Sequence, residues 1–218
     1  MNNQEGTFTD ITVSSGLDGI DAKNTISAAF SDYDLDGDLD LFLTHWGTER
    51  PWVIAGVSRG DTETLWDNVS DIDGVRFFSK SVSSNISDTL IAGRGGLTDF
   101  GQLNGGYDYS FTPILARLNS DRYPDFISVG DFVNTRLFMS NAETGGTVTF
   151  NDISTGSTIT DQNGMGSVVG DIDNDGDLDW FVSSIANGQV NAGNHLYIND
   201  GEGTFDNQAE EAGVIDGG

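Results

Sequence analysis

The sequence contains no cysteine, so disulfide bonds, thiol nucleophiles and cysteine-bound zinc or iron centres are all excluded. It has only 9 Lys or Arg residues against 35 Asp or Glu, and its formal net charge is −26. A chain with so few cations lacks the positive surface that nucleic acids and anionic membranes require, so we expect neither partner. No run of 18 apolar residues is present, which argues against membrane insertion, and residues 1–6 show no signal-peptide pattern.

The composition instead favours aspartate and glycine. The chain has 28 Asp but only 7 Glu, together with 29 Gly. Asp and Gly suit turns and metal-binding loops, and few stretches of this sequence have a helical pattern. Because 36% of the residues are hydrophobic, the chain has enough apolar material to build a core. We therefore expect a globular protein made of short strands and turns.

The two ends of the chain carry the same sequence pattern. Residues 2–16 read NNQEGTFTDITVSSG, and residues 199–213 read NDGEGTFDNQAEEAG without a gap in the alignment. Three landmarks recur in a fixed order between them: a Phe-centred strand, an Asp-rich loop that leads into an apolar strand, and a last strand that ends at Asn. The resulting repeat units span approximately residues 5–70, 74–143 and 145–200, with a partial unit at 201–218.

Each unit is predicted to contain about four antiparallel strands. Short β-branched and aromatic runs between Asp, Asn and Gly turns are typical of strands, and NDG at residues 199–201 is a strong hairpin signal. Four-stranded units in series are the blades of a β-propeller. The sequence therefore predicts an all-β fold with about three blades and the start of a fourth. Three blades cannot close a ring, so we expect the chain to be a piece of a longer propeller whose remaining blades lie elsewhere in a longer chain. The alternatives are an open array of blades or an oligomer that completes the ring.

Two of the Asp-rich loops have the pattern DxDxDGxxD, which is typical of a calcium site. Alternate residues of a curled loop aim their oxygens at one point, and the glycine permits the sharp turn. Ca²⁺ accepts six to eight oxygen ligands, whereas Mg²⁺ demands a stricter octahedron. The alternative is a pair of solvated acidic turns. The predicted ligands of two structural Ca²⁺ ions are Asp32, Asp34, Asp36, Asp38 and Asp40 in the first loop, and Asp171, Asp173, Asp175, Asp177 and Asp179 in the third unit. Asp38 and Asp177, at the seventh position, are expected to offer their backbone carbonyls.

The corresponding segment of the second unit departs from this pattern. It places Arg117 at the first position, Asn119 at the third and Arg122 where the glycine stands in the other loops. We therefore expect no calcium there. Either the Arg117 guanidinium bridges Asp121 and Asp125 in place of the metal, or both arginines point into water.

These motifs resemble the FG-GAP/VCBS repeat, in which DxDxDGxxD and an apolar strand are followed by LYxNxGxGTF, as at residues 196–205. The likeness covers nearly the whole chain and is weak across the second loop. It implies a calcium-bearing β-propeller of the kind found in integrin α-subunits, cartilage acidic protein relatives, secreted bacterial proteins and some fungal lectins. The resemblance also implies that the calcium is structural. The Gly-Ala-Pro ending of integrin repeats is absent, so the VCBS branch fits better.

A candidate ligand surface lies in an insertion after the first Asp loop. This insertion holds His45, Trp46, Arg50 and Trp52, and such aromatic and cationic side chains suit a surface that stacks sugars or binds a protein. The alternative is a loop that folds back on its own hydrophobic residues. Tyr107 and Tyr109 lie in a second insertion, which is expected either to face a ligand or to form a covering flap.

No catalytic pattern is visible, because the two histidines lie in different units and no nucleophile elbow, HExxH or complete phosphate loop occurs. Millimolar extracellular calcium suits weak loop sites, which favours a secreted or extracellular location. We therefore expect a non-enzymatic, calcium-binding propeller segment of an extracellular protein-binding or adhesion protein. The alternative is a carbohydrate-binding propeller or a polysaccharide-active lyase or hydrolase.

Overall fold

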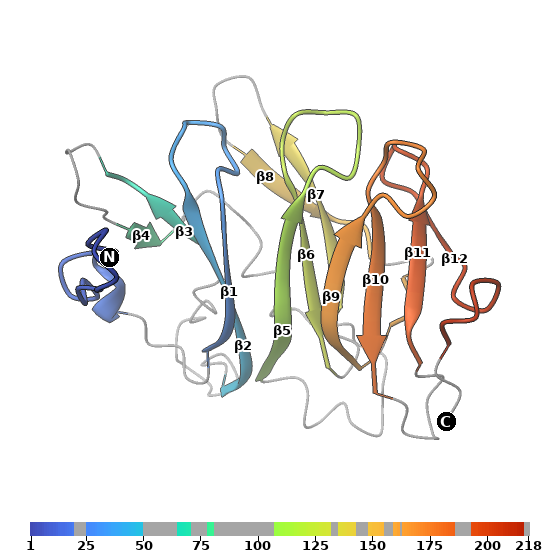
Figure 1. Ribbon diagram of the computed structural model, residues 1–218, viewed down its shortest axis with the longest axis horizontal. Helices are drawn as coiled ribbons and strands as arrows, with labels where there is room; N and C mark the ends of the chain where they lie inside the picture. The colour runs from blue at the N-terminus through green and yellow to red at the C-terminus, as the bar shows by residue number, and fades with distance from the viewer. Residues whose placement is uncertain are drawn as a thin grey trace, which may run out of the picture.

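The computed structural model describes residues 1–19, 25–49, 65–70, 78–80, 107–131, 135–142, 148–154, 159–161, 163–185 and 193–215. Within these ranges the chain is all-β, apart from a single turn of 3₁₀ helix, η1 (Leu17–Gly19). Figure 1 shows three groups of strands that stand side by side in a row, with the two termini at opposite ends of the row. The described residues form no helix with the length and apolar character of a membrane span.

Each group is an antiparallel meander in which strands that follow one another in the chain pair with one another. This arrangement confirms the predicted all-β units of four strands. The first group contains β1 (Thr25–Ser31), β2 (Asp40–Glu49), β3 (Leu65–Asn68) and β4 (Phe78–Lys80); the second contains β5 (Tyr107–Ala116), β6 (Asp125–Gly130), β7 (Arg136–Ala142) and β8 (Val148–Asp152); the third contains β9 (Gly164–Gly170), β10 (Asp179–Ser184), β11 (His195–Asn199) and β12 (Phe205–Asn207).

The groups are arranged like neighbouring blades of a propeller. Their first strands lie beside one another, since β1 contacts β5 and β5 contacts β9. The end of β2, residues 46–49, also pairs with residues 107–109 of β5, which joins the first two groups into one eight-stranded sheet. The third group forms a separate four-stranded sheet. The described residues form an open row of three blades and no closed ring.

The Phe-centred strands pair with the strand that precedes them in the chain, so each one completes the sheet of the preceding group. The sheets therefore begin one strand later than the repeat units derived from the sequence, which start at the Phe-centred strand. Phe8 forms only an isolated bridge, with Asn2. The three pairs are Phe78 with Asn68, Phe150 with Ser140 and Phe205 with Asn199.

Hydrophobic cores fill the spaces between neighbouring groups. Every residue of β6 is buried, because β6 belongs to the middle group and both of its faces are covered. Trp180 is 0% exposed, and its ring centroid lies 4.9 Å from that of Tyr197. The core between the first two groups contains Tyr33, Phe42, Leu65, Phe126, Phe138, Val148 and Phe150, and the core between the second and third contains Leu118, Ile127, Val129, Leu137, Ile159, Trp180, Val182, Tyr197 and Phe205.

The two ends of the row expose residues whose counterparts are buried inside it. Tyr33 and Leu118 occupy the second position of their Asp-rich segments and are 2% and 1% exposed, since each packs into the core with the following group. Ile172 has the same position in the third group and is 50% exposed. At the other end, Phe30 on β1 is 59% exposed, while its counterparts in the other groups pack against the cores. Among the described residues, neither apolar end face has a neighbouring sheet.

A buried aspartate at the ninth position of each Asp-rich segment joins that segment to the third strand of its group. In the second group, Asp125 is 0% exposed. Its Oδ2 accepts the backbone N–H of Leu118 at 2.9 Å, and its Oδ1 accepts the backbone N–H of Ser140 at 2.9 Å. Because both oxygens have donors, the carboxylate is satisfied although it is shielded from water.

The other two groups repeat this arrangement. The same pair of bonds joins Asp40 to the N–H groups of Tyr33 (3.4 Å) and Asn68 (2.8 Å), and joins Asp179 to those of Ile172 (2.8 Å) and Asn199 (3.0 Å). The aspartate at this position therefore holds the sheet together whether or not the rest of the segment has the metal-binding pattern.

Replacing Asp125 tests this structural role. Asp125→Ala leaves two buried backbone N–H groups without an acceptor, and we expect it to lower the free energy of unfolding by about 2–5 kcal/mol in urea titrations. The loss is expected to be the same in chelator and in calcium. Asn119→Ala, in the same segment, is the control and should cost less than about 1 kcal/mol. A loss from Asp125→Ala that appears only in calcium would contradict the structural role.

Candidate metal centre

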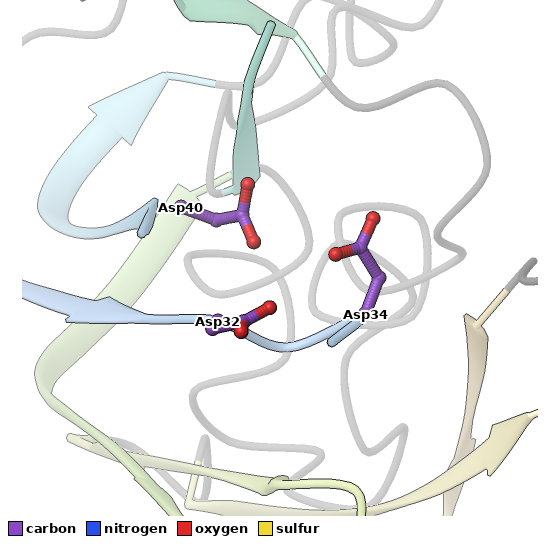
Figure 2. Close-up of side chains that lie close together, drawn as sticks. All are labelled: Asp32, Asp34 and Asp40. Carbon is purple, nitrogen blue, oxygen red and sulfur yellow. The ribbon is translucent and has the colours of Figure 1, made fainter. Parts of the chain in front are cut away.

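Three aspartates of the first loop converge on one point. Asp32 follows the end of β1, Asp34 lies in the loop and Asp40 begins β2. One carboxylate oxygen from each of the three lies within 4.8 Å of the others. Figure 2 shows the three side chains extending from these separate places toward a shared space. The loop therefore gathers oxygen donors of the kind that a hard divalent cation prefers.

The third group has the same arrangement in its β9–β10 loop. Asp171, Asp173 and Asp179 also present oxygens within 4.8 Å of one another. The backbones of the two loops agree as well, because Leu35 and Asn174 have φ values of 62° and 64°, and the glycines two residues later have φ values of 101° and 102°. The left-handed conformation at Gly37 and Gly176 is the one that the glycine of the motif was expected to supply.

Of the predicted ligands in each loop, the structure brings together the carboxylates at positions one, three and nine of the DxDxDGxxD motif. The carboxylates at positions five and seven of the motif lie outside these clusters. Asp36 Oδ1 accepts the backbone N–H of Asp38 at 2.9 Å, and Asp175 Oδ1 accepts the N–H of Asp177 at 2.9 Å. The carboxylates of Asp36 and Asp175 therefore shape the turns, while the three-carboxylate clusters carry the convergent oxygens.

The segment of the second group differs in both backbone and side chains. Ser120 and Arg122, which correspond to the two left-handed positions, have negative φ values. Arg122 lies over the ring of Tyr123 at 5.0 Å and donates to its hydroxyl at 3.0 Å. Arg117 is exposed and makes no ion pair with Asp121 or Asp125, so the arginine bridge does not form. Of the two alternatives for Arg117, exposure to water is the one observed.

The carboxylates of the first cluster lie close together, and the pKa values of Asp34 and Asp40 reflect their surroundings. Burial, together with the charge of Asp34, raises the pKa of Asp40 to about 7. Burial and the charge of Asp36 raise the pKa of Asp34 as well. In the third group, partial loss of hydration and the charge of Asp175 raise the pKa of the exposed Asp173. Each shift means that the neutral, protonated form is favoured over the free carboxylate, and the part of it that comes from neighbouring carboxylates is a repulsion that a bound cation would offset.

The donor set fits Ca²⁺. All of the convergent atoms are carboxylate oxygens, which are the ligands that calcium prefers. Asp32 Oδ1 is shielded from solvent and accepts no hydrogen bond within the described part of the chain. A buried carboxylate oxygen without a donor is costly unless a cation binds it. Asp32, Asp34 and Asp40, and their counterparts Asp171, Asp173 and Asp179, are the residues that would hold the ion.

The structure changes which residues can belong to the predicted ligand surface. His45 is 0% exposed and lies with Nδ1 3.2 Å from Thr25 Oγ1, so it is not available to a ligand, and its assignment to that surface was wrong. Trp46 is 37% exposed and packs against Tyr109 and Phe111, with ring centroids 5.6 and 6.1 Å away. Trp46 lies six residues along β2 from Asp40, roughly 20 Å from the loop. Arg50 and Trp52 lie outside the described residues.

A buried polar cluster between the second and third groups was not predicted. Asp161 Oδ2 accepts the hydroxyl of Thr135, and Asp161 Oδ1 lies 3.9 Å from His195 Nε2. Asn207 Nδ2 lies 2.9 Å from His195 Nδ1. Burial raises the pKa of Asp161 and lowers that of His195. No sequence motif signals this cluster, because its members come from four separate segments of the chain.

One segment of the chain matches a known protein family. A family model described as an FG-GAP-like repeat matches residues 117–182. This match supports the predicted resemblance to FG-GAP-type repeats over that part of the chain. The matched segment runs from the first residue of the second Asp-rich segment to β10, just beyond the third loop, and so covers one repeat from loop to loop. FG-GAP repeats are typically non-catalytic and occur in extracellular proteins. No curated protein matches the chain.

The raised pKa of Asp40 predicts that a rise in pH lowers the stability of the metal-free protein but strengthens its binding of calcium. Without metal, the folded state holds a proton on Asp40 up to about pH 7, whereas the unfolded state releases it near 3.8, the ordinary pKa of an aspartate. The stability of the metal-free protein should therefore fall as pH rises between these values. Calcium must displace that proton, so its affinity should rise through about pH 7.

Thermal unfolding in EDTA and calorimetric calcium titrations, both at about pH 6 and about pH 8, measure these two effects. The expected result is a lower unfolding temperature in EDTA and a tighter calcium affinity at the higher pH. A calcium affinity that does not change over this range would contradict the raised pKa of Asp40.

Proposed function

We propose that this chain is a non-enzymatic, calcium-stabilised β-propeller segment of an extracellular protein that binds other proteins, as in adhesion. The observation that carries this proposal is the pair of matching aspartate clusters, which occupy the same place in the first and third groups and share one backbone conformation. The FG-GAP-type repeat supports the propeller and the extracellular location.

The clusters connect cation binding to the stability of the sheets. Asp40 offers an oxygen to the candidate centre and also accepts the backbone N–H of Asn68 in β3. A bound Ca²⁺ supplies the positive charge that offsets the repulsion among the carboxylates. Because Asp40 faces both the loop and β3, fixing its carboxylate also fixes the turn between β1 and β2 relative to the third strand.

An extracellular location follows from the expected affinity. Each cluster contains only three convergent carboxylates in a loop at the molecular surface, and the weak loop sites of extracellular modules bind calcium at about 10⁻⁴ to 10⁻³ M. Only extracellular calcium is abundant enough to fill such sites continuously. The two ions are therefore permanent structural components, not signals.

The apolar end faces indicate how the segment is completed. Ile172 exposes half of its surface where Tyr33 and Leu118 insert into the following group. We infer that a further unit of the same kind covers this face, supplied by a longer chain or by another copy. Four or more blades are needed to close a propeller, so both sources would complete the same ring.

Trp46 supports an alternative function, carbohydrate binding. Its ring is partly exposed and packs against two further aromatic rings, Tyr109 and Phe111. Aromatic rings with one exposed face stack on sugars, and this cluster lies far along β2 from the calcium loop. A glycan ligand at this place would leave the structural role of calcium unchanged.

Calcium addition tests the main proposal. At a free concentration 100 times the dissociation constant, each site should stabilise the fold by about 2.7 kcal/mol, so thermal unfolding should shift upward between EDTA and CaCl₂. Calorimetry should count two ions in the wild type and one in Asp34→Ala or Asp173→Ala. Asn119→Ala, in the second segment, is the matched control and should keep both ions. Absence of binding and of any thermal shift would overturn the proposal.

Light scattering tests how the end face is covered. If other copies supply the missing blades, the 218-residue chain should form a closed oligomer that Ile172→Asp dissociates. If a longer chain supplies them, the isolated segment should be monomeric, and Ile172→Asp should change its unfolding free energy by less than about 1 kcal/mol. A monomer that loses more than about 2 kcal/mol would mean that Ile172 is already packed, against the open face.

Glycan-array binding decides the alternative function. If the aromatic cluster binds sugars, the wild type should bind at least one glycan and Trp46→Ala should lose that binding while retaining both calcium ions. Phe30→Ala removes another exposed aromatic ring and serves as the control. Binding that survives in Trp46→Ala would exclude this cluster as the glycan site.

A further inference from the structure

Asp67 lies beside the first candidate centre but outside its sequence motif. It is on β3, where its Oδ1 accepts the hydroxyl of Tyr33 at 3.0 Å. The next residue, Asn68, donates its backbone N–H to Asp40 at 2.8 Å, which brings β3 to the edge of the centre. The charge of Asp67 is among the smaller causes that raise the pKa values of Asp34 and Asp40. Asp67 is therefore a carboxylate placed next to the cluster by tertiary structure.

The third group has no equivalent carboxylate. The residue before Asn199 is Ile198, which occupies the place of Asp67, and Ile172 occupies the place of Tyr33. The charges that act on Asp173 come from its own loop, Asp175 and Asp179. The first centre thus has an additional acidic neighbour and a hydroxyl that holds it, whereas the third has apolar side chains at both places.

Burial also differs between the two centres. Asp32 and Asp34 are half-buried, whereas Asp171 and Asp173 are exposed. A charge–charge interaction is stronger where water screens it less, so an added carboxylate has more effect at the first centre. Ligand charge and rigidity are the properties that set calcium affinity in protein loops.

We propose that Asp67, held by Tyr33 outside the three-carboxylate cluster, is an outer acidic group of the first centre, and that it makes this centre bind calcium more tightly than the centre of the third group. This inference rests on the proposed calcium-binding function. It assigns different roles to two loops with the same motif: the first fills at lower calcium concentration, and the third fills afterwards.

Calorimetric titration of single-site variants with CaCl₂ tests the inference. Asp173→Ala leaves the first centre to be measured, and Asp34→Ala leaves the third. Asp67→Asn should weaken the first centre about tenfold, as loss of an outer partner of a metal site does, and leave the third unchanged. Tyr33→Phe keeps the carboxylate but removes its hydrogen bond, and should cause a smaller loss. Glu210→Gln, an exposed change of equal charge, is the control and should alter neither centre.

A transplant gives an independent measurement should Asp67→Asn disturb folding. In β3, Asp67 lies opposite Ser79, whereas in β11, Ile198 lies opposite Asp206. Ile198→Asp with Asp206→Ser reproduces the first pair, and Ile198→Asn with Asp206→Ser is its uncharged control. In the Asp34→Ala background, the charged version should strengthen the third centre severalfold relative to the control.

The outcomes separate this inference from the proposed function. If neither loop binds calcium, the proposed function itself fails. If both loops bind but Asp67→Asn leaves the affinity of the first centre unchanged, or the transplant fails to strengthen the third, the role of Asp67 is overturned and the calcium-stabilised propeller stands. If Asp67→Asn weakens calcium binding at the first centre and leaves the third centre unchanged, the proposed role of Asp67 is supported.

Discussion

The hydrogen-bonded aspartate at the end of each Asp-rich segment is the interaction on which every sheet of this protein depends. It is buried in all three groups, and it joins the turn before the second strand to the end of the third strand. The second group keeps Asp125 although its segment has lost the left-handed turn and the convergent carboxylates. The role of this position is therefore separable from metal binding. Where the other aspartates are present, the same residue serves both roles.

Charge repulsion and hydrophobic packing have opposite effects on the stability of the fold. A net charge of −26 opposes compaction, and the carboxylate clusters concentrate part of that charge in two loops. The cores between the groups oppose this repulsion, with aromatic rings such as Phe126 and Phe138 stacked 5.6 Å apart. Since a domain is stable by only about 5–15 kcal/mol, neutralising the two loops changes a large share of the total. This balance explains why a structural cation suits a protein with so few positive side chains.

Because the same unit is repeated, residues at the two ends of the row can be compared with their counterparts inside it. Each interior core is built from the far face of one group and the near face of the next, so an end face has half of a core. The exposure of Phe30 and Ile172 at the two ends follows directly, because their counterparts are covered by a neighbouring group. The same comparison shows that the repeats are not equivalent. Asp67 and Tyr33 add a polar contact to the first group where the third has Ile198 and Ile172.

The sequence by itself determined the strands, the four-stranded units and the Asp loops, because turn residues, alternating side chains and the glycine of the motif act over a few neighbouring residues. Only the tertiary structure decided which strand each Phe-centred strand joins, since pairing depends on contacts outside the repeat unit. It also buried His45, which a local pattern of aromatic and cationic residues had assigned to a surface. Asp67 beside the first loop and Asp161 beside His195 are products of the same long-range packing, because their partners come from distant segments.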